Sequence, residues 1–235
     1  MANCHPDKVP LKWKLTLIVF LALVVLGHVL RESWPWGSDS QLLKAQWSGA
    51  LEGWRDVPGA PAGKTLYLCP VPVQGDGGGR PEWQGDRQQQ SGIPESLQQM
   101  AMFAITAWNP AGRALPAAEN QKRNMHLGAS LATLGPKHMW RSFGFDLQGY
   151  RENGYTVAVP KGEADSAREH LVQLAHEFGQ SAIYEFWLSP GKETLQLHRA
   201  IVPVGLKDVA ATTAMALCEP PHHRNSDPYL YFADS

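Results

Sequence analysis

The pattern of apolar and polar positions divides the chain into one uninterrupted apolar run near the N-terminus and a longer region of alternating periodicities. The run extends from Leu15 to Leu30, contains no charged residue and follows three lysines, Lys8, Lys12 and Lys14. A helix that crosses a bilayer needs about 20 apolar residues, and tryptophans on both sides of this run are typical of membrane interfaces. We therefore expect residues 15–30 to form a transmembrane helix.

The basic flank predicts the orientation of this helix. Positive residues favour the cytoplasmic side, so residues 1–14 would be cytoplasmic and the rest of the chain would lie outside the cytoplasm. The predicted partner is the lipid bilayer, contacted through residues 15–30, and the sequence names no protein partner. The alternative is a cleaved signal peptide, which would leave a secreted or periplasmic protein.

After a linker at residues 31–63, the pattern alternates between the period of a strand and the period of a helix. The expected elements are strands at 64–69 and 102–108, a helix at 116–134, strands at 137–146 and 155–159, a helix at 163–178, and strands at 181–188 and 194–202. The central six match the split βαβ pattern. We expect an α+β fold: a ferredoxin-like βαββαβ sandwich with extra strands, preceded by one N-terminal transmembrane helix. The domain would span residues 64–204, and residues 205–235 would form a C-terminal tail.

Composition and motifs exclude several classes of function. The 21 basic and 22 acidic residues leave a net charge of −1, so the composition does not indicate the excess of basic residues that is typical of nucleic-acid binding. The segment Gly59–Thr65 has the wrong glycine spacing for a phosphate-binding loop, and we expect neither a cofactor nor a metal site. Outside the cytoplasm Cys69 and Cys218 would either form a disulfide or remain free thiols, and the sequence leaves both open.

Three segments carry a family resemblance: ITAWNP at residues 105–110, AAENQKRNMHL at 117–127 and EFGQSAI at 177–183. Over about residues 64–204 the chain resembles a bacterial family of unknown function, DUF3293. The resemblance implies a small α/β domain without an assigned activity. The matching positions are Thr106, Asn109, Pro110, Glu119, Asn120, Asn124, Gly179 and Gln180, with looser matches at Gly144 and Glu152.

The amide side chains among these positions suggest two roles. Asn120 and Asn124 are four residues apart and therefore share a helix face, while Asn109 lies where a strand ends. Amides that converge there could bind a small polar ligand, because each offers two donors and an acceptor. Alternatively, they form an Asx turn and tie a loop to the helix.

The sequence thus predicts a binding or scaffold module for a small polar ligand or an envelope partner. Its candidate ligand-binding residues are Thr106, Asn109, Asn120, Asn124, Gln180, Glu119 and Glu152. The alternative is a hydrolase or transferase that uses Glu119 or Glu152 as general acid or base, which a raised carboxyl pKa would favour. A third hypothesis is a structural role in an envelope complex, with Trp47, Trp54 and Trp83 as interface anchors.

Overall fold

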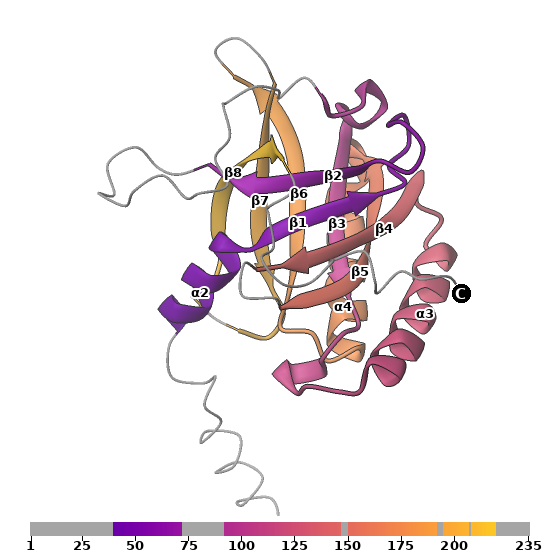
Figure 1. The fold of residues 1–235 in the computed structure, drawn as a ribbon, viewed down its shortest axis with the longest axis vertical. Helices are drawn as coiled ribbons and strands as arrows, with labels where there is room; N and C mark the ends of the chain where they lie inside the picture. The colour runs from indigo at the N-terminus through magenta and orange to yellow at the C-terminus, as the bar shows by residue number, and fades with distance from the viewer. Residues whose placement is uncertain (1–39, 72–91, 147–149, 192–194, 207, 220–235) are drawn as a thin grey trace, which may run out of the picture. The chain divides into compact units, whose positions relative to one another are not determined.

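The computed structural model describes residues 40–71, 92–146, 150–191, 195–206 and 208–219. In this part of the chain, antiparallel strands form one sheet that closes on itself in the order β1-β2-β8-β7-β6-β3-β5-β4 (Figure 1). The strands are β1 (Leu51–Arg55), β2 (Thr65–Pro70), β3 (Met100–Thr106), β4 (His138–Phe145), β5 (Arg151–Pro160), β6 (Ala182–Pro190), β7 (Leu195–Pro203) and β8 (Ala211–Cys218). The helices are α2 (Ser40–Gly49), α3 (Ala117–Thr133) and α4 (Ala164–Glu177), with short 3-10 turns η2 (Glu95–Leu97), η3 (Pro110–Gly112) and η4 (Lys161–Glu163).

Strand β3 shows how the two faces of the sheet are used. Successive side chains of a strand point to opposite faces, so Met100, Met102 and Ala104 join the main apolar cluster inside the closed sheet. The alternate residues Ala101, Phe103 and Ile105 belong to a second cluster on the outer face. Because both faces of β3 are covered, its sequence is a continuous apolar run with six of seven residues buried.

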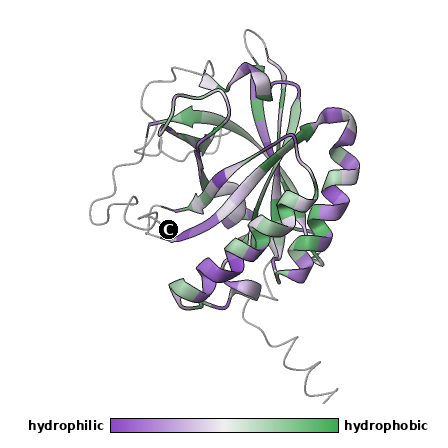
Figure 2. Ribbon diagram, turned by 90° about the vertical axis from the view of Figure 1, so that its right-hand side faces the viewer, coloured by the Kyte–Doolittle hydropathy of each residue, from purple (hydrophilic) through white to green (hydrophobic). Residues whose placement is uncertain are grey.

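Helices α3 and α4 cover this outer face. Leu127 and Leu131 of α3 and Leu171 and Ala175 of α4 are buried against β3, β5 and β6. In Figure 2 both helices carry hydrophilic as well as hydrophobic residues, as expected when one side of a helix packs and the other meets solvent.

Cys69 and Cys218 lie on the neighbouring strands β2 and β8, and the structure joins them in a disulfide with their Cα atoms 6.0 Å apart. The bond links positions 149 residues apart in the sequence. A link across so long a segment stabilises the fold chiefly by restricting the unfolded chain.

The predicted ferredoxin-like sandwich is wrong. Strands β6, β3, β5 and β4 do lie side by side with α3 and α4 on one face, but the sheet does not stop there. Strand β1 forms inside the predicted linker and β8 inside the predicted tail, and with β2 and β7 they close the sheet. An open sheet would leave unpaired edge strands, and closure removes them.

The expected single-pass membrane protein also requires correction. Among the described residues, no helix combines the length and apolarity needed to cross a bilayer. The segment 15–30, on which the transmembrane helix and the localisation depended, lies outside those residues. The proposed interface anchor Trp54 is 0% exposed and belongs to the core, while Trp83 lies outside the described residues.

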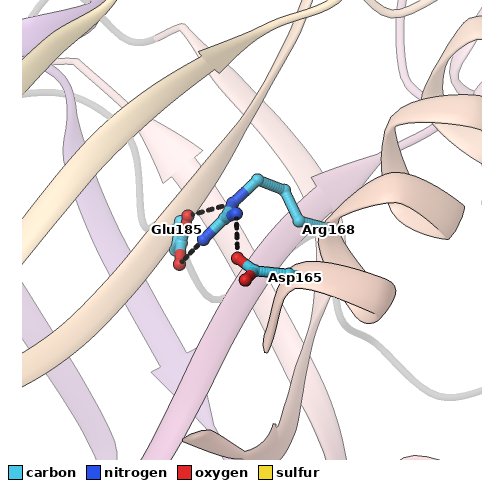
Figure 3. A network of polar contacts seen from close by, with 3 residues as sticks. All are labelled: Asp165, Arg168 and Glu185. Carbon is cyan, nitrogen blue, oxygen red and sulfur yellow. Dashed lines mark hydrogen bonds and ion pairs between the residues drawn. The ribbon is translucent and has the colours of Figure 1, made fainter. Parts of the chain in front are cut away.

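Helix α4 is tied to β6 by an ion pair that provides a first prediction (Figure 3). Arg168 donates from Nε and Nη2 to the two carboxylate oxygens of Glu185, at 2.7 and 2.8 Å, and from Nη1 to Asp165 at 2.6 Å. The Glu185 side chain is 12% exposed, whereas that of Asp165 is 92% exposed.

We expect Glu185→Gln to lower the free energy of unfolding by about 1–2 kcal/mol, because it weakens a largely buried two-point pair. The matched variant Asp165→Asn should cost no more than about 0.5 kcal/mol, since solvent screens an exposed pair. Urea denaturation of the two variants measures both values, and equal losses would contradict this assignment.

Candidate functional site

The connection between β3 and α3 is held in place by the side chains of the family motif. Thr106 ends β3, and its hydroxyl donates to the carbonyl of Asn153 at 2.6 Å while accepting from the amide of Trp108 at 3.0 Å. Thr106 therefore anchors the start of the loop to the neighbouring strand β5.

Asn109 and Asn120 bind each other across this loop. The amide N–H of Asn109 donates to Oδ1 of Asn120 at 2.9 Å, and Nδ2 of Asn120 donates to Oδ1 of Asn109 at 2.8 Å. Both side chains also bond the backbone of Leu115. Asn109 has a φ of +45°, a left-handed conformation that asparagine tolerates better than most residues.

The loop is also tied to the end of α4. Gln180 donates to the carbonyl of Trp108 at 2.9 Å. Arg123 of α3 donates to the carbonyls of Ala107 and Phe178, at 3.1 and 2.6 Å. Sequence reasoning did not select Arg123 as a site residue, although it is the arginine of the RN pair in the motif.

Two predicted site residues lie apart from this network. Glu119 is exposed in the first turn of α3, where an acidic residue favourably opposes the helix dipole. Asn124 is 8% exposed, and its Oδ1 has no hydrogen-bond partner among the described residues. Most of the side-chain amides that were predicted to bind a ligand thus form hydrogen bonds that hold the loop.

Glu152 joins Asn109 at the start of β5, together with Tyr150. The Tyr150 hydroxyl donates a short hydrogen bond to Glu152, and the Asn109 amide bonds both residues. Tyr150 is 50% exposed and Glu152 is half-buried, so solvent reaches this group. We call Asn109, Tyr150 and Glu152 the rim.

Burial raises the pKa of Glu152 to about 7, and the hydrogen bonds from Tyr150 and Asn109 limit the rise. Partial burial and the nearby Glu152 carboxylate also raise the pKa of Tyr150, which keeps its hydroxyl protonated as a donor. The rim therefore holds a carboxyl group that changes its charge near neutral pH.

A second carboxyl group, Glu52, lies behind the rim. In the strand register Glu52 of β1 pairs with Gly144 of β4, and Gly144 pairs with Glu152 of β5. Paired residues of adjacent strands share a face, so the three form a row that we call the acidic row. Glu52 is 2% exposed; burial raises its pKa to about 8, with Arg199 opposing the rise and Glu152 adding to it.

Arg199 and Tyr184 complete the charged group around Glu52. The Arg199 guanidinium donates to the carbonyls of Ala50, Trp47 and Ser48 at 2.7, 2.9 and 2.7 Å, and lies 4.6 Å from the centre of the Tyr184 ring. The Tyr184 hydroxyl donates to the carbonyl of Trp47 at 3.1 Å. Burial raises the pKa of Tyr184, so it too remains a neutral donor.

Sequence reasoning missed Glu52, Tyr150, Tyr184 and Arg199. The available signal was a charged residue at an apolar position of the strand period, because Arg199 in LQLHRAIVP alternates in step with Leu197 and Ile201. Glu52 gave a weaker signal because its short strand lies in a segment rich in tryptophan, glycine and proline.

The chemistry of the site is that of carboxyl groups and hydrogen-bond donors. Among the described residues, no group of three or more His, Cys, Asp and Glu side chains could hold a metal ion. A cavity of about 10 Å³, the size of one water, lies elsewhere, between apolar residues that include Leu195, Leu197 and Met215.

The comparisons with known proteins identify one family. No curated protein and no solved structure matches the chain. The family model described as a protein of unknown function (DUF3293) matches residues 105–183. The match contains the loop network and Glu152, whereas Glu52 and Arg199 lie outside it. It confirms the resemblance seen in the sequence over residues 105–183.

Proposed function

We propose that this domain is a binding module for a small cationic ligand and that the rim is its contact site. The observation that carries the proposal is the position of Glu152: a carboxyl group that solvent reaches and that Tyr150 and Asn109 orient by hydrogen bonds. A carboxylate held in this way offers a fixed acceptor for a charge-assisted hydrogen bond.

The charges behind the rim favour a cation over an anion. With both carboxyl groups ionised, Glu52 and Glu152 exceed the single charge of Arg199 by one negative unit. Arg199 is 1% exposed and donates to three backbone carbonyls, so it is not offered to an anion at the surface. A ligand with one positive charge would balance the group.

The test is the pH dependence of binding of methylammonium, followed by isothermal titration calorimetry and by amide NMR shifts. Because the Glu152 pKa is raised to about 7, the carboxylate is ionised above that value, and affinity should rise between pH 6 and 8. Glu152→Gln should weaken binding at pH 8 about tenfold or more, the loss expected for a charge-assisted hydrogen bond.

Glu119→Gln is the matched control, because it removes an exposed acidic residue of α3 that is not part of the rim. It should bind methylammonium as the unmodified protein does. Equal affinity of Glu152→Gln and the unmodified protein, or affinity that does not change with pH, would overturn the proposal.

The same residues support acid–base catalysis as a second candidate function. A general acid or base acts best when its pKa lies near the working pH, and the Glu152 pKa of about 7 meets that condition. Glu119, the other candidate, is exposed and separate from the rim. A hydrolytic or transfer activity whose pH profile inflects near 7, and which Glu152→Gln abolishes, would favour the enzyme.

A further inference from the structure

A third apolar cluster lies on the outer face of the closed sheet, on β1, β2, β4 and β8. Leu68 of β2 points into the closed sheet, so its neighbours Tyr67 and Cys69 point outward. In Figure 1, β1 and β4 lie toward the viewer, and no helix is drawn in front of them. We call this cluster the outer aromatic face, and its buried members are Leu51, Tyr67, Cys69, Phe143 and Phe145.

The outer aromatic face is covered. Tyr67 is 6%, Phe143 4% and Phe145 8% exposed, whereas side chains on the solvated face of an antiparallel sheet keep much of their surface in water. Helices α3 and α4 make their contacts with β3, β5 and β6, so they are not the cover. Several residues of this side make further polar, ring or electrostatic contacts: Arg55, Tyr67, Phe143 and Arg151.

Arginines border the outer aromatic face. Arg55 of β1 is paired with Arg141 of β4 in the strand register, and like charges directly opposite each other destabilise a sheet. The Arg151 guanidinium of β5 lies 3.7 Å from the centre of the Phe143 ring. Arg55 also has an ion pair with Asp56 at 3.9 Å, between two side chains that are 36% and 57% exposed, which is worth little. A segment that suits this face would therefore carry both aromatic and acidic residues.

We propose that residues 227–234 of this chain, DPYLYFAD, dock on the outer aromatic face, with their aromatic side chains against the cluster and their two aspartates near the arginines. These residues lie outside the described part of the chain, but the chain leaves β8 at this face. Cys218 is paired with Tyr67 in the strand register and bonded to Cys69.

The length of chain after β8 is sufficient. From Glu219 to Asp227 the chain can extend about 26 Å, and the neighbouring strands β2, β1, β4 and β5 span about 14 Å. Composition favours the same segment over residues 72–91, which follow β2. That segment contains Trp83 as its only aromatic residue and consists mainly of glycine, glutamine and charged residues, whereas residues 227–234 contain three aromatic residues and no basic one.

Docking at this face is independent of the rim. Arg151 points to the outer aromatic face, and Glu152, the next residue of β5, therefore points to the opposite face of the sheet. A partner protein that replaced residues 227–234 would need the same chemistry, namely an extended segment with aromatic and acidic side chains.

The test is hydroxyl-radical footprinting of the full chain carrying both Tyr231→Ala and Phe232→Ala. We expect oxidation of Tyr67 and Phe143 to rise several-fold, while the amide exchange of β3 stays unchanged and shows that the fold is intact. The matched control Trp83→Ala should leave both residues protected. Unchanged protection in the double variant, or exposure of the face by Trp83→Ala, would overturn the proposal.

A synthetic peptide of residues 225–235 tests direct docking. Added to the double variant, it should bind and restore the protection of Tyr67 and Phe143, and salt should weaken the binding because it screens exposed charges. A peptide with both Asp227→Asn and Asp234→Asn should bind more weakly. If the first peptide gives no protection, the docking is wrong, and if the two peptides bind equally, the assigned contact between aspartates and arginines is wrong.

Discussion

Replacing Trp54 by alanine should lower the free energy of unfolding by about 3–5 kcal/mol, as is typical when a large aromatic side chain is removed from a core. Trp54 is 0% exposed. Its ring packs edge-to-face against Trp140 and Phe186, with ring centres 5.4 and 5.1 Å away. These residues come from β1, β4 and β6, so the lost contacts join β1 to its neighbour β4 and, across the inside of the closed sheet, to β6.

The matched variant Trp54→Phe should cost clearly less. It keeps an aromatic ring at the position, and the indole Nε1 of Trp54 has no hydrogen-bond partner among the described residues, so no such bond is lost. Urea denaturation of both variants measures the difference. A loss below about 1 kcal/mol for Trp54→Ala would mean that Trp54 is not in a packed core.

Replacing Arg199 by methionine should cost roughly 3 kcal/mol and release the last turn of α2. Methionine keeps much of the apolar stem but removes every donor of the guanidinium. The carbonyls of Trp47, Ser48 and Ala50 then lose charge-assisted hydrogen bonds, which are the stronger kind. Amide hydrogen exchange of residues 44–50 should accelerate more than that of β3.

The cost of Arg199→Met should also grow with pH. Arg199 lowers the pKa of Glu52, which burial raises to about 8. Below that value Glu52 is neutral and does not gain from the positive charge, whereas above it the ionised carboxylate loses a stabilising neighbour. The difference in unfolding free energy should therefore be larger at pH 9 than at pH 6.

Glu52→Gln supplies the control for this pH effect. The neutral amide cannot ionise, so in its background the cost of Arg199→Met should not change between pH 6 and 9. A pH dependence that persists in the double variant would assign the effect to another group.

Helices α3 and α4 and the central strands could be predicted because their patterns are local, whereas α2 lies inside the predicted linker. The predicted helix at 116–134 is α3 at Ala117–Thr133, and the predicted helix at 163–178 is α4 at Ala164–Glu177. Strand β1 could not be predicted in the same way. It has five residues, too few for a period-2 pattern to stand out, and it forms because β2 and β4 pair with it.

Likewise, one part of the candidate site could be predicted from nearby residues, and another part depends on the pairing of distant strands. Asn109 and Asn120, eleven residues apart, lie in the family motif, and the expectation that an amide network lies at the end of a strand followed from their positions. By contrast, Glu152 helps to raise the pKa of Glu52, which is one hundred residues away in the sequence and comes near through the pairing of β1, β4 and β5.

The order of residues along the chain was enough to predict α3, α4, the inner strands and the family resemblance, because helix and strand periods depend on neighbours a few positions apart. Only the tertiary structure shows that the sheet closes. The same is true of the acidic row and of the hydrogen bonds from Arg199 to α2. Strand partners and buried charges are selected by contacts between remote segments, and no local pattern of side chains encodes which segments will meet.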